Sequence, residues 1–304
     1  MFTVGLGPIP NSVFTITTMA IAVPTGIKIF NWIFTIWKGS IRFTTPMLYA
    51  IGFIVTFTIG GISGVMHAMS SSDAQQQDTY FIVAHFHYVL FGGAIMGIFG
   101  GLYYWFPKFA GRMFNEKIGK LQFWTLFIGQ NITFFPMHFV GMDGMPRRVY
   151  TYSSEMGWTA LNALETAGSI LIVISVLLFI HNIVKSWRSG EQASGDPWDG
   201  RTLEWSMSSP PPEYNFEEIP QVHVVDDWWA KKRGLVVEQT PAGASGEEGE
   251  IHLPQPSFWP LVAAVGLLIG GYGVIYSYPT AIAGLVVTMI GVYAWSFEPV
   301  NDPE

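Results

Sequence analysis

Two histidines, His85 and His87, lie two positions apart in FIVAHFHYVLFGG, residues 81–93, one of the most apolar stretches of the chain. On a helix they would project about 200° apart and so could not bind one metal ion together. A pair at i and i+4 would share a face, and this pair lacks that spacing. Each imidazole therefore needs its own partner in apolar surroundings, either a hydrogen bond within the protein or a separate metal on its own side.

Glycines follow the histidine pair on the same predicted helix, at Gly92, Gly93, Gly97, Gly100 and Gly101. We expect them to let flat, bulky groups approach the backbone closely. Two haems flanking one helix would satisfy this pattern, with irons on the order of 15 Å apart. Two separately hydrogen-bonded structural histidines are the alternative.

A lysine, Lys28, lies in the middle of the apolar segment AIAVPTGIKIFNW. An ammonium at membrane depth costs roughly 2.5 to 3.5 kcal/mol on insertion scales. Pro24 removes a helical hydrogen bond, and Thr25 and Lys28 share a face at i, i+3. The pattern favours a water-lined proton path, and an interhelical hydrogen bond is the alternative.

Further polar residues mark the predicted outer ends of the helices. Arg147 and Arg148, in GMDGMPRRVYTY, are either solvated or bind a fixed anion at the membrane surface. His138 either bonds such an anion or faces water. His67 and Asp78 end two neighbouring segments, and we expect His67 to be solvated.

The composition indicates an integral membrane protein. Half of the 304 residues are hydrophobic, 12% are charged and the mean hydropathy is +0.34. The chain has no cysteine, which excludes disulfides, thiolate metal sites and iron-sulfur clusters within it. A net charge of −7 argues against nucleic-acid binding.

Runs of about 20 apolar residues, enough to cross roughly 30 Å of hydrocarbon, predict an all-α, polytopic membrane bundle of about seven transmembrane helices. They lie at 12–37, 47–68, 79–106, 119–141, 158–186, 257–277 and 279–297. We therefore expect a five-helix core over 1–188, a polar tail or linker over 189–256, and a two-helix hairpin over 257–304. The acidic part of the tail, 235–250, is predicted to be disordered.

Loop charges predict the orientation. Basic residues occur where the first, third and fifth spans end, at Lys38, Arg42, Lys108, Arg112, Lys117, Lys120, Lys185 and Arg188. The positive-inside rule places these loops and the C-terminus in the cytoplasm, and the N-terminus outside. Because no signal peptide precedes an outer N-terminus, we expect earlier helices to be supplied upstream or by another chain.

Three segments, DTYFIVAHFHYVLFGG, PTGIKIFNW and NITFFPMHFVGMDGMPRR, together resemble the C-terminal part of subunit I of A-type haem-copper oxidases, over residues 1 to about 188. WDGRTLEWSMSSPPPEYNF resembles the tail that follows in bacterial members, and 257–304 is similar to a small two-helix accessory subunit. The resemblance implies a proton-pumping cytochrome c oxidase of the bacterial plasma membrane. A nitric oxide reductase and a haem-free proton-coupled transporter are the alternatives.

The resemblance implies roles for the histidine helix. His85 would be the proximal ligand of the high-spin haem, His87 an axial ligand of the low-spin haem, and Phe86 would lie between the two. Lys28 and Thr25 match the pathway that delivers protons to the oxygen site.

At the outer side, Arg147 and Arg148 match the pair that binds haem propionates. Asp78 matches a magnesium-site carboxylate, although the preceding residue is Gln77 where the family often has histidine.

The resemblance also implies cofactors and partners. The cofactors are two haems, of A type, copper B and magnesium. In the family, the copper B ligands and the other axial histidine precede the stretch resembling MFTVG. The implied partners are therefore the remaining N-terminal portion of subunit I, subunit II with its dinuclear copper, subunit III, and cytochrome c as electron donor.

Overall fold

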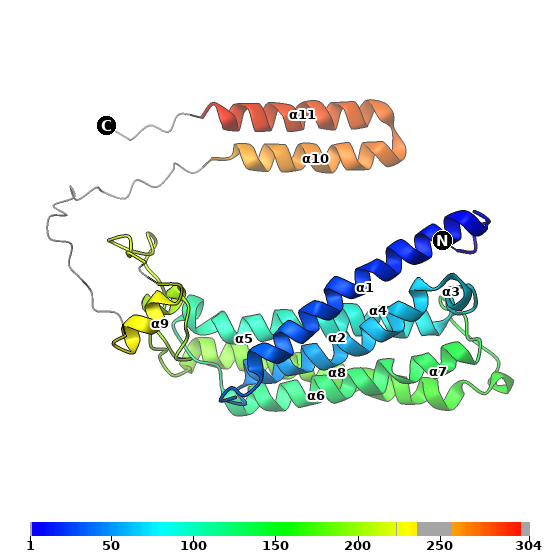
Figure 1. Cartoon of the computed structure of the whole chain (residues 1–304), viewed down its shortest axis with the longest axis horizontal. Coiled ribbons are helices and arrows are strands. Elements are labelled where there is room, and N and C mark those ends of the chain that lie inside the picture. Colours follow the sequence, from blue (N-terminus) through cyan, green and yellow to red (C-terminus); the bar gives the residue numbers. More distant parts are fainter. Residues whose placement is uncertain (1, 223, 236–256, 299–304) are drawn as a thin grey trace. The chain divides into compact units, whose positions relative to one another are not determined.

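The protein is α-helical throughout the part that the computed structural model describes, which comprises residues 2–222, 224–235 and 257–298 (Figure 1). Apart from helices, these residues form only two isolated β-bridges, Thr79 with Pro146 and Arg112 with Gln192. This confirms the predicted fold class. The chain forms two compact units, Met1–Pro211 with Val224–Arg233, and Pro212–His223 with Gly234–Glu304.

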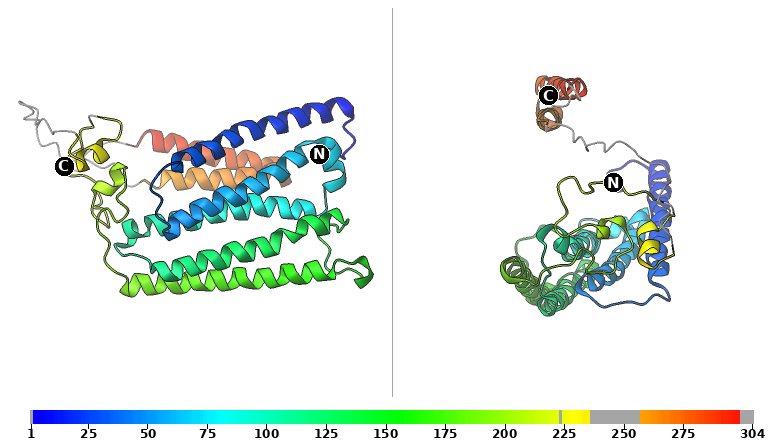
Figure 2. Two further views of the ribbon diagram at one scale, coloured as in Figure 1. Left: turned by 60° about the horizontal axis from the view of Figure 1, so that its bottom comes forward. Right: turned by 90° about the vertical axis from the view of Figure 1, so that its left-hand side faces the viewer.

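The first unit is a bundle of long antiparallel helices (Figure 2). Its helices are α1 Pro8–Ile36, α2 Thr45–Ala68, α3 Ser70–Gln76, α4 Tyr80–Val89, α5 Met96–Ala110, α6 Glu116–Phe134, α7 Pro136–Met142, α8 Thr159–Ser189 and α9 Asp227–Lys232. Every predicted span corresponds to a helix or to two helices in line. Among the described residues of both units, five segments are long and apolar enough to cross a membrane: Pro8–Ile36, Thr45–Ala68, Tyr80–Ala110, Thr159–Ser189 and Tyr278–Ser296.

Helix α2 packs on α4 at backbone contact distance. The buried face of α2 carries small and hydroxylic residues at helical spacing, including Gly52, Thr56, Gly60 and Ser63. A Cβ atom at Gly60 would lie 2.9 Å from the backbone of Tyr88. Only glycine therefore lets the two helices come this close, and this approach brings α2 beside the histidines of α4.

A π-helical turn, Leu90–Ile95, joins α4 to α5 directly after the histidine pair. Its glycines meet α2: a Cβ atom at Gly92 would lie 2.8 Å from Thr56, and one at Gly93 would lie 3.0 Å from Phe57. These two glycines thus serve helix packing here, whereas Gly97 has no atom near its Cβ position. Single π-helical turns inside α-helices occur frequently at functional sites.

A buried polar cluster joins α2, α6 and α8. The Gln122 side chain accepts a hydrogen bond from Tyr49, and its Nε2 donates to Ser175 Oγ at 2.9 Å. Ser175 Oγ in turn donates to the carbonyl of Gln122 at 2.9 Å. Buried polar groups fully bonded in this way fix the register of the three helices.

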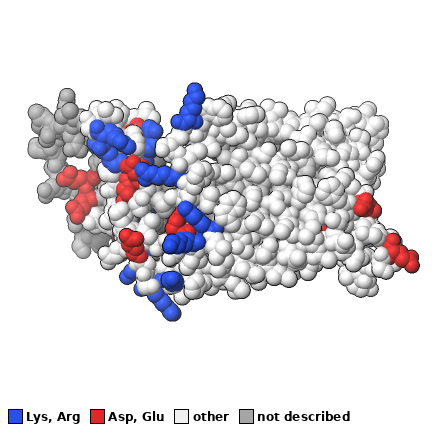
Figure 3. All heavy atoms as spheres, turned by 90° about the horizontal axis from the view of Figure 1, so that it is seen from below, with Lys and Arg blue, Asp and Glu red and all other residues white. Residues whose placement is uncertain are grey.

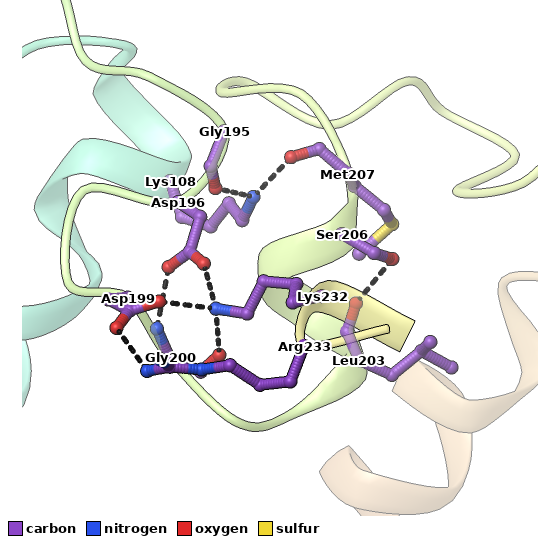
Figure 4. A network of polar contacts seen from close by, with 10 residues as sticks. All are labelled: Lys108, Gly195, Asp196, Asp199, Gly200, Leu203, Ser206, Met207, Lys232 and Arg233. Carbon is purple, nitrogen blue, oxygen red and sulfur yellow. Dashed lines mark hydrogen bonds and ion pairs between the residues drawn. The ribbon is translucent and has the colours of Figure 1, made fainter. Parts of the chain in front are cut away.

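Part of the predicted tail folds onto the end of the bundle. Lys108, at the end of α5, is only 8% exposed and donates to the carbonyls of Gly195, Met207 and Ser208. Figure 4 shows the bonds from Lys108 to Gly195 and Met207. The predicted linker is therefore split, because 190–211 and 224–233 belong to the first unit. Apart from its first residue, the predicted disordered stretch 235–250 lies outside the described residues.

We call residues 190–211 and 224–233, which fold onto this end of the bundle, the cap. Ion pairs join its two parts. Lys232 Nζ lies 2.6 Å from Asp196 Oδ2 and 2.9 Å from Asp199 Oδ1 (Figure 4). The hydrogen bond from Lys232 lowers the pKa of Asp199. Burial alone would lower the pKa of Lys232, but its bonds to Asp196 and Asp199 outweigh burial and raise it.

Figure 3 shows Lys and Arg side chains gathered at one end of the molecule, while the middle of this face carries almost no charge. The charged end is the one where α5 and α8 end and the cap folds back. There Lys108 donates to the Gly195 carbonyl, and Arg112 donates to the Gly190 carbonyl. An uncharged middle of this kind suits lipid contact.

The second unit contains a hairpin of α10 Trp259–Tyr276 and α11 Tyr278–Ser296. Its helices meet through small residues. A Cβ atom at Gly284 would lie 2.1 Å from the backbone of Gly270, and one at Gly291 would lie 2.6 Å from that of Ala263. Such close packing is typical of helix pairs in lipid.

Candidate functional site

The two histidines of α4 face different neighbours. His85 points to α2, where a Cβ atom at Gly64 would lie 3.1 Å from its Cε1. His87 stacks on Phe134 of α6, with ring centroids 4.0 Å apart and planes 9° apart. The predicted division of the pair between opposite sides of one helix is confirmed.

Each imidazole is held by its Nδ1 atom. His85 Nδ1 lies 3.0 Å from the Gly60 carbonyl and 2.9 Å from Ser63 Oγ. His87 Nδ1 lies 2.8 Å from the Val83 carbonyl. Because a carbonyl can only accept, each Nδ1 carries the proton and each Nε2 keeps its lone pair.

Neither Nε2 atom has a hydrogen-bond partner among the described residues. Histidines that bind metals usually donate their other ring N–H to a carbonyl or carboxylate, which fixes the tautomer and the ring. His85 and His87 both have this arrangement. The two residues therefore fit two separate haem irons, one on each side of α4.

Phe86 lies between the two histidines in sequence and is half-buried. Its ring centroid is 4.6 Å from that of His87, with the planes tilted by 33°. The structure thus places an aromatic ring beside one candidate ligand.

The loops that precede α4 and follow α7 bring Asp78 and Arg147 together. Arg147 Nη2 and Nε both lie 2.7 Å from Asp78 Oδ1, and the backbone N–H of Arg147 donates to the carbonyl of Asp78 at 2.8 Å. The sequence singled out both residues but did not pair them. Arg148 is exposed, and its backbone takes a left-handed φ of 69°.

Asp78 alone does not make a magnesium site. Among the described residues, no group of three His, Cys, Asp or Glu side chains could hold a metal ion, and Arg147 occupies Oδ1 of Asp78. The residues present do not by themselves fit magnesium, which would need its other ligands from elsewhere.

His67 is largely shielded from solvent, contrary to the expectation that it is solvated. Its side chain is 12% exposed because the ring packs edge-on against Phe81 and His85, with centroids 5.4 and 4.8 Å away. Its Nδ1 lies 3.6 Å from Oδ1 of Asp73, a residue that the sequence did not indicate. Burial raises the pKa of Asp73.

His138 is packed against aromatic side chains and does not simply face water. Its Nδ1 lies 3.0 Å from the Phe135 carbonyl, and its ring packs on Phe81 and Tyr88 of α4 at 5.0 and 5.7 Å. It is therefore a packing residue between α7 and α4.

Lys28 and Thr25 share α1 but do not bond each other. The Thr25 hydroxyl donates to the Ile21 carbonyl at 2.8 Å, and Lys28 Nζ lies 5.7 Å from the ring centre of Trp32. No described residue of α1 is fully buried. The chain alone therefore presents both side chains on an open helix face rather than in a closed channel.

A cavity of about 1040 Å³ lies near the capped end of the bundle, between α1, α2 and α5. Its walls include Trp32, Tyr49, Phe53, Met96 and Trp229. The histidines do not line it, so it is separate from the candidate ligands.

The sequence is similar to known respiratory oxidases. A family model described as "Cytochrome C and Quinol oxidase polypeptide I" matches residues 1–174. Cytochrome c oxidase subunit 1 of Bacillus sp. strain PS3 is 49% identical over 296 residues, which cover 95% of this chain and 48% of the relative. Quinol oxidase subunit 1 of Bacillus subtilis strain 168 is 45% identical over 304 residues, which cover 99% of this chain and 46% of the relative.

These alignments have two consequences. The chain spans about half the length of the curated relatives it matches. Matches over 95 and 99% of the chain must include most of 257–304, so a segment corresponding to most of the hairpin belongs to the subunit 1 chain in these relatives.

A solved structure supports the fold. A chain from the cryo-EM structure of a heme-copper terminal oxidase dimer matches with a TM-score of 0.54 and 19% identity. The match covers 63% of this chain and 39% of that chain. At this identity the likeness concerns the helical arrangement alone.

Proposed function

Because this chain belongs to the cytochrome c and quinol oxidase polypeptide I family, we propose that it forms part of the catalytic subunit of a proton-pumping terminal oxidase. The observation that carries the proposal is the pair of histidines on α4, each with Nδ1 bonded to a backbone carbonyl and Nε2 left for a metal. The haems, with copper B, supply electron transfer and reduction of oxygen to water when bound.

In this proposal the residues of α4 hold the two irons. His85 binds the high-spin haem through Nε2, and the Gly60 carbonyl keeps its ring in place. His87 binds the low-spin haem on the opposite side, oriented by Val83. Phe86 separates the two sites, and haem A is the subtype that the family resemblance favours.

Polar residues outside α4 deliver protons and bind anions in this proposal. Lys28 and Thr25 deliver protons from the cytoplasmic side once neighbouring helices enclose the exposed face of α1. Arg147 and Arg148 neutralise the haem propionates at the outer surface. Arg147 is already held by Asp78 through Nε and Nη2.

The proposed complex needs further chains and cofactors. Copper B and the second axial ligand of the low-spin haem come from the N-terminal portion of subunit I, in the same or a separate chain. Subunit II with its dinuclear copper, subunit III and cytochrome c complete the electron path. The complex lies in the bacterial plasma membrane with the C-terminus in the cytoplasm, consistent with the basic residues at the capped end of the bundle (Figure 3).

The test is haem binding in the assembled complex. A pyridine haemochrome assay should detect haem, and His85→Ala should abolish the high-spin signal while His87→Ala abolishes the low-spin signal. A complex without haem would favour a proton-coupled transporter. An unchanged high-spin spectrum in His85→Ala would contradict the ligand assignment.

The electron donor and the reaction need separate measurements. The family includes cytochrome c and quinol oxidases, so oxygen consumption should be compared with reduced cytochrome c and with a quinol. We expect cytochrome c to support turnover. Reduction of nitric oxide without oxygen consumption would favour a nitric oxide reductase.

A further inference from the structure

His67 occupies a defined place beside the candidate ligand of the high-spin haem. It lies in the last turn of α2, and its ring contacts Phe81 and His85 of α4 edge-on, at 81° and 62°. Asp73 of α3 lies on its other side. The ring therefore bridges the iron-ligand helix and an acidic side chain near the outer surface.

The polar atoms of His67 lack hydrogen bonds in the described protein. Both ring nitrogens are buried and without a partner, and the 3.6 Å to Asp73 Oδ1 is too long for a hydrogen bond. A neutral imidazole always carries one N–H donor. Buried donors are rarely left unpaired, so this N–H points to an acceptor that a small movement or a bound group provides.

Packing alone does not account for a histidine here. A phenylalanine would make the same edge-on contacts with Phe81 and His85 without burying two polar atoms. The acidic group closest to the ring, Asp73, is 13% exposed and can accept a hydrogen bond. A carboxylate is thus the acceptor chemistry that fits this position.

We propose that His67 is a positioning residue of the high-spin haem site, which donates its ring N–H to a carboxylate beside His85. That carboxylate is either Asp73 or a carboxylate of the haem. The inference rests on the proposed function, because it requires haem at His85. A donor to a carboxylate draws negative charge away from the iron, and hydrogen bonding near the site tunes the haem potential.

Two substitutions separate hydrogen bonding from packing. His67→Phe keeps the ring and loses the N–H, whereas His67→Asn places an amide near Nδ1 and loses the ring. In the complete complex, we expect His67→Phe to lower the midpoint potential of the high-spin haem and His67→Asn to keep it close to the wild-type value. His181→Phe, at an exposed position of α8, is the matched control.

The identity of the acceptor follows from Asp73→Asn. If Asp73 is the acceptor, adding His67→Phe to Asp73→Asn should cause no further shift, and if the haem carboxylate is the acceptor, the two shifts should add. A wild-type potential in a haem-loaded His67→Phe complex would overturn this inference alone. Absence of haem from the wild-type complex would overturn the proposed function together with it.

Discussion

Arg147 binds one carboxylate oxygen of Asp78, Oδ1, through two nitrogens, Nε and Nη2, each at 2.7 Å. The contact closes the loop between α7 and α8 onto the start of α4, where the Tyr80 N–H also donates to the Met145 carbonyl at 2.9 Å. Two segments about 70 residues apart in sequence are thereby fixed at the N-terminal end of α4.

We predict a measurable coupling between Arg147 and Asp78. Their side chains are 28 and 55% exposed, so solvent screening limits the coupling to about 0.5–1 kcal/mol. A double-mutant cycle with Arg147→Ala and Asp78→Asn, followed by denaturant unfolding, measures it. The exposed i, i+4 pair of Lys120 and Glu116, 3.6 Å apart, is the control and should give a smaller value. Equal couplings would contradict the prediction.

Two glutamines on α6 offer a second test. Gln122 and Gln130 are both 0% exposed, but Gln122 is hydrogen-bonded and both amide atoms of Gln130 have no partner. Gln122→Met should cost about 1–3 kcal/mol because it leaves the buried Tyr49 hydroxyl without its acceptor. Gln130→Met should be neutral or stabilising, since it removes unpaired polar atoms. The prediction is checked by the denaturant midpoints of unfolding of the two variants. A comparable loss of stability in both variants would contradict it.

The cap on the bundle should respond to pH through Lys232. The pKa of Asp199 is lowered from 3.8, so its stabilising contribution is full above that value and is lost as the pH falls through the lower folded value. The pKa of Lys232 is raised from 10.5, so its contribution is full below 10.5 and is lost only as the pH rises above it. Pepsin cleavage within 190–211 and 224–233 should therefore increase between about pH 4 and about pH 2.

The matched variants for the cap are Lys232→Gln and Lys185→Gln. Lys232→Gln removes the bonds to Asp196 and Asp199 and should make the cap sensitive to pepsin already at about pH 4. Lys185 is exposed on α8, and its substitution should leave the cleavage pattern unchanged. Cleavage that is independent of Lys232 would show that other contacts hold the cap.

The sequence predicts those features of the site that depend on local periodicity. The opposite orientation of His85 and His87 follows from the angle per residue of a helix, and the helices follow from their apolar lengths. The burial of His67 could not be predicted in this way, because it depends on how α3 folds back and on the contact of α2 with α4. The same holds for Asp78 and Arg147, which long-range loop pairing brings together.

The π-helical turn after His87 was also not predicted from the sequence. Glycines at 92 and 93 indicated close approach to the backbone, but not which neighbour approaches. The structure assigns that neighbour as α2, through Thr56 and Phe57. A residue pattern on one helix carries no information about the face of a second helix until the two are packed.

Two glycines of α2 provide the sharpest test of how His85 is held. A Cβ atom at Gly64 would lie 3.1 Å from His85 Cε1, whereas one at Gly61 would meet nothing within 4 Å. Gly61→Ala should raise the free energy of unfolding by about 0.5–1 kcal/mol through helix propensity alone. Gly64→Ala should raise the free energy of unfolding by less, because the His85 ring must move by a few tenths of an ångström. The high-spin haem spectrum should change in Gly64→Ala and stay unchanged in Gly61→Ala. If both variants gave equal stability and wild-type spectra, α2 would not position the His85 ring.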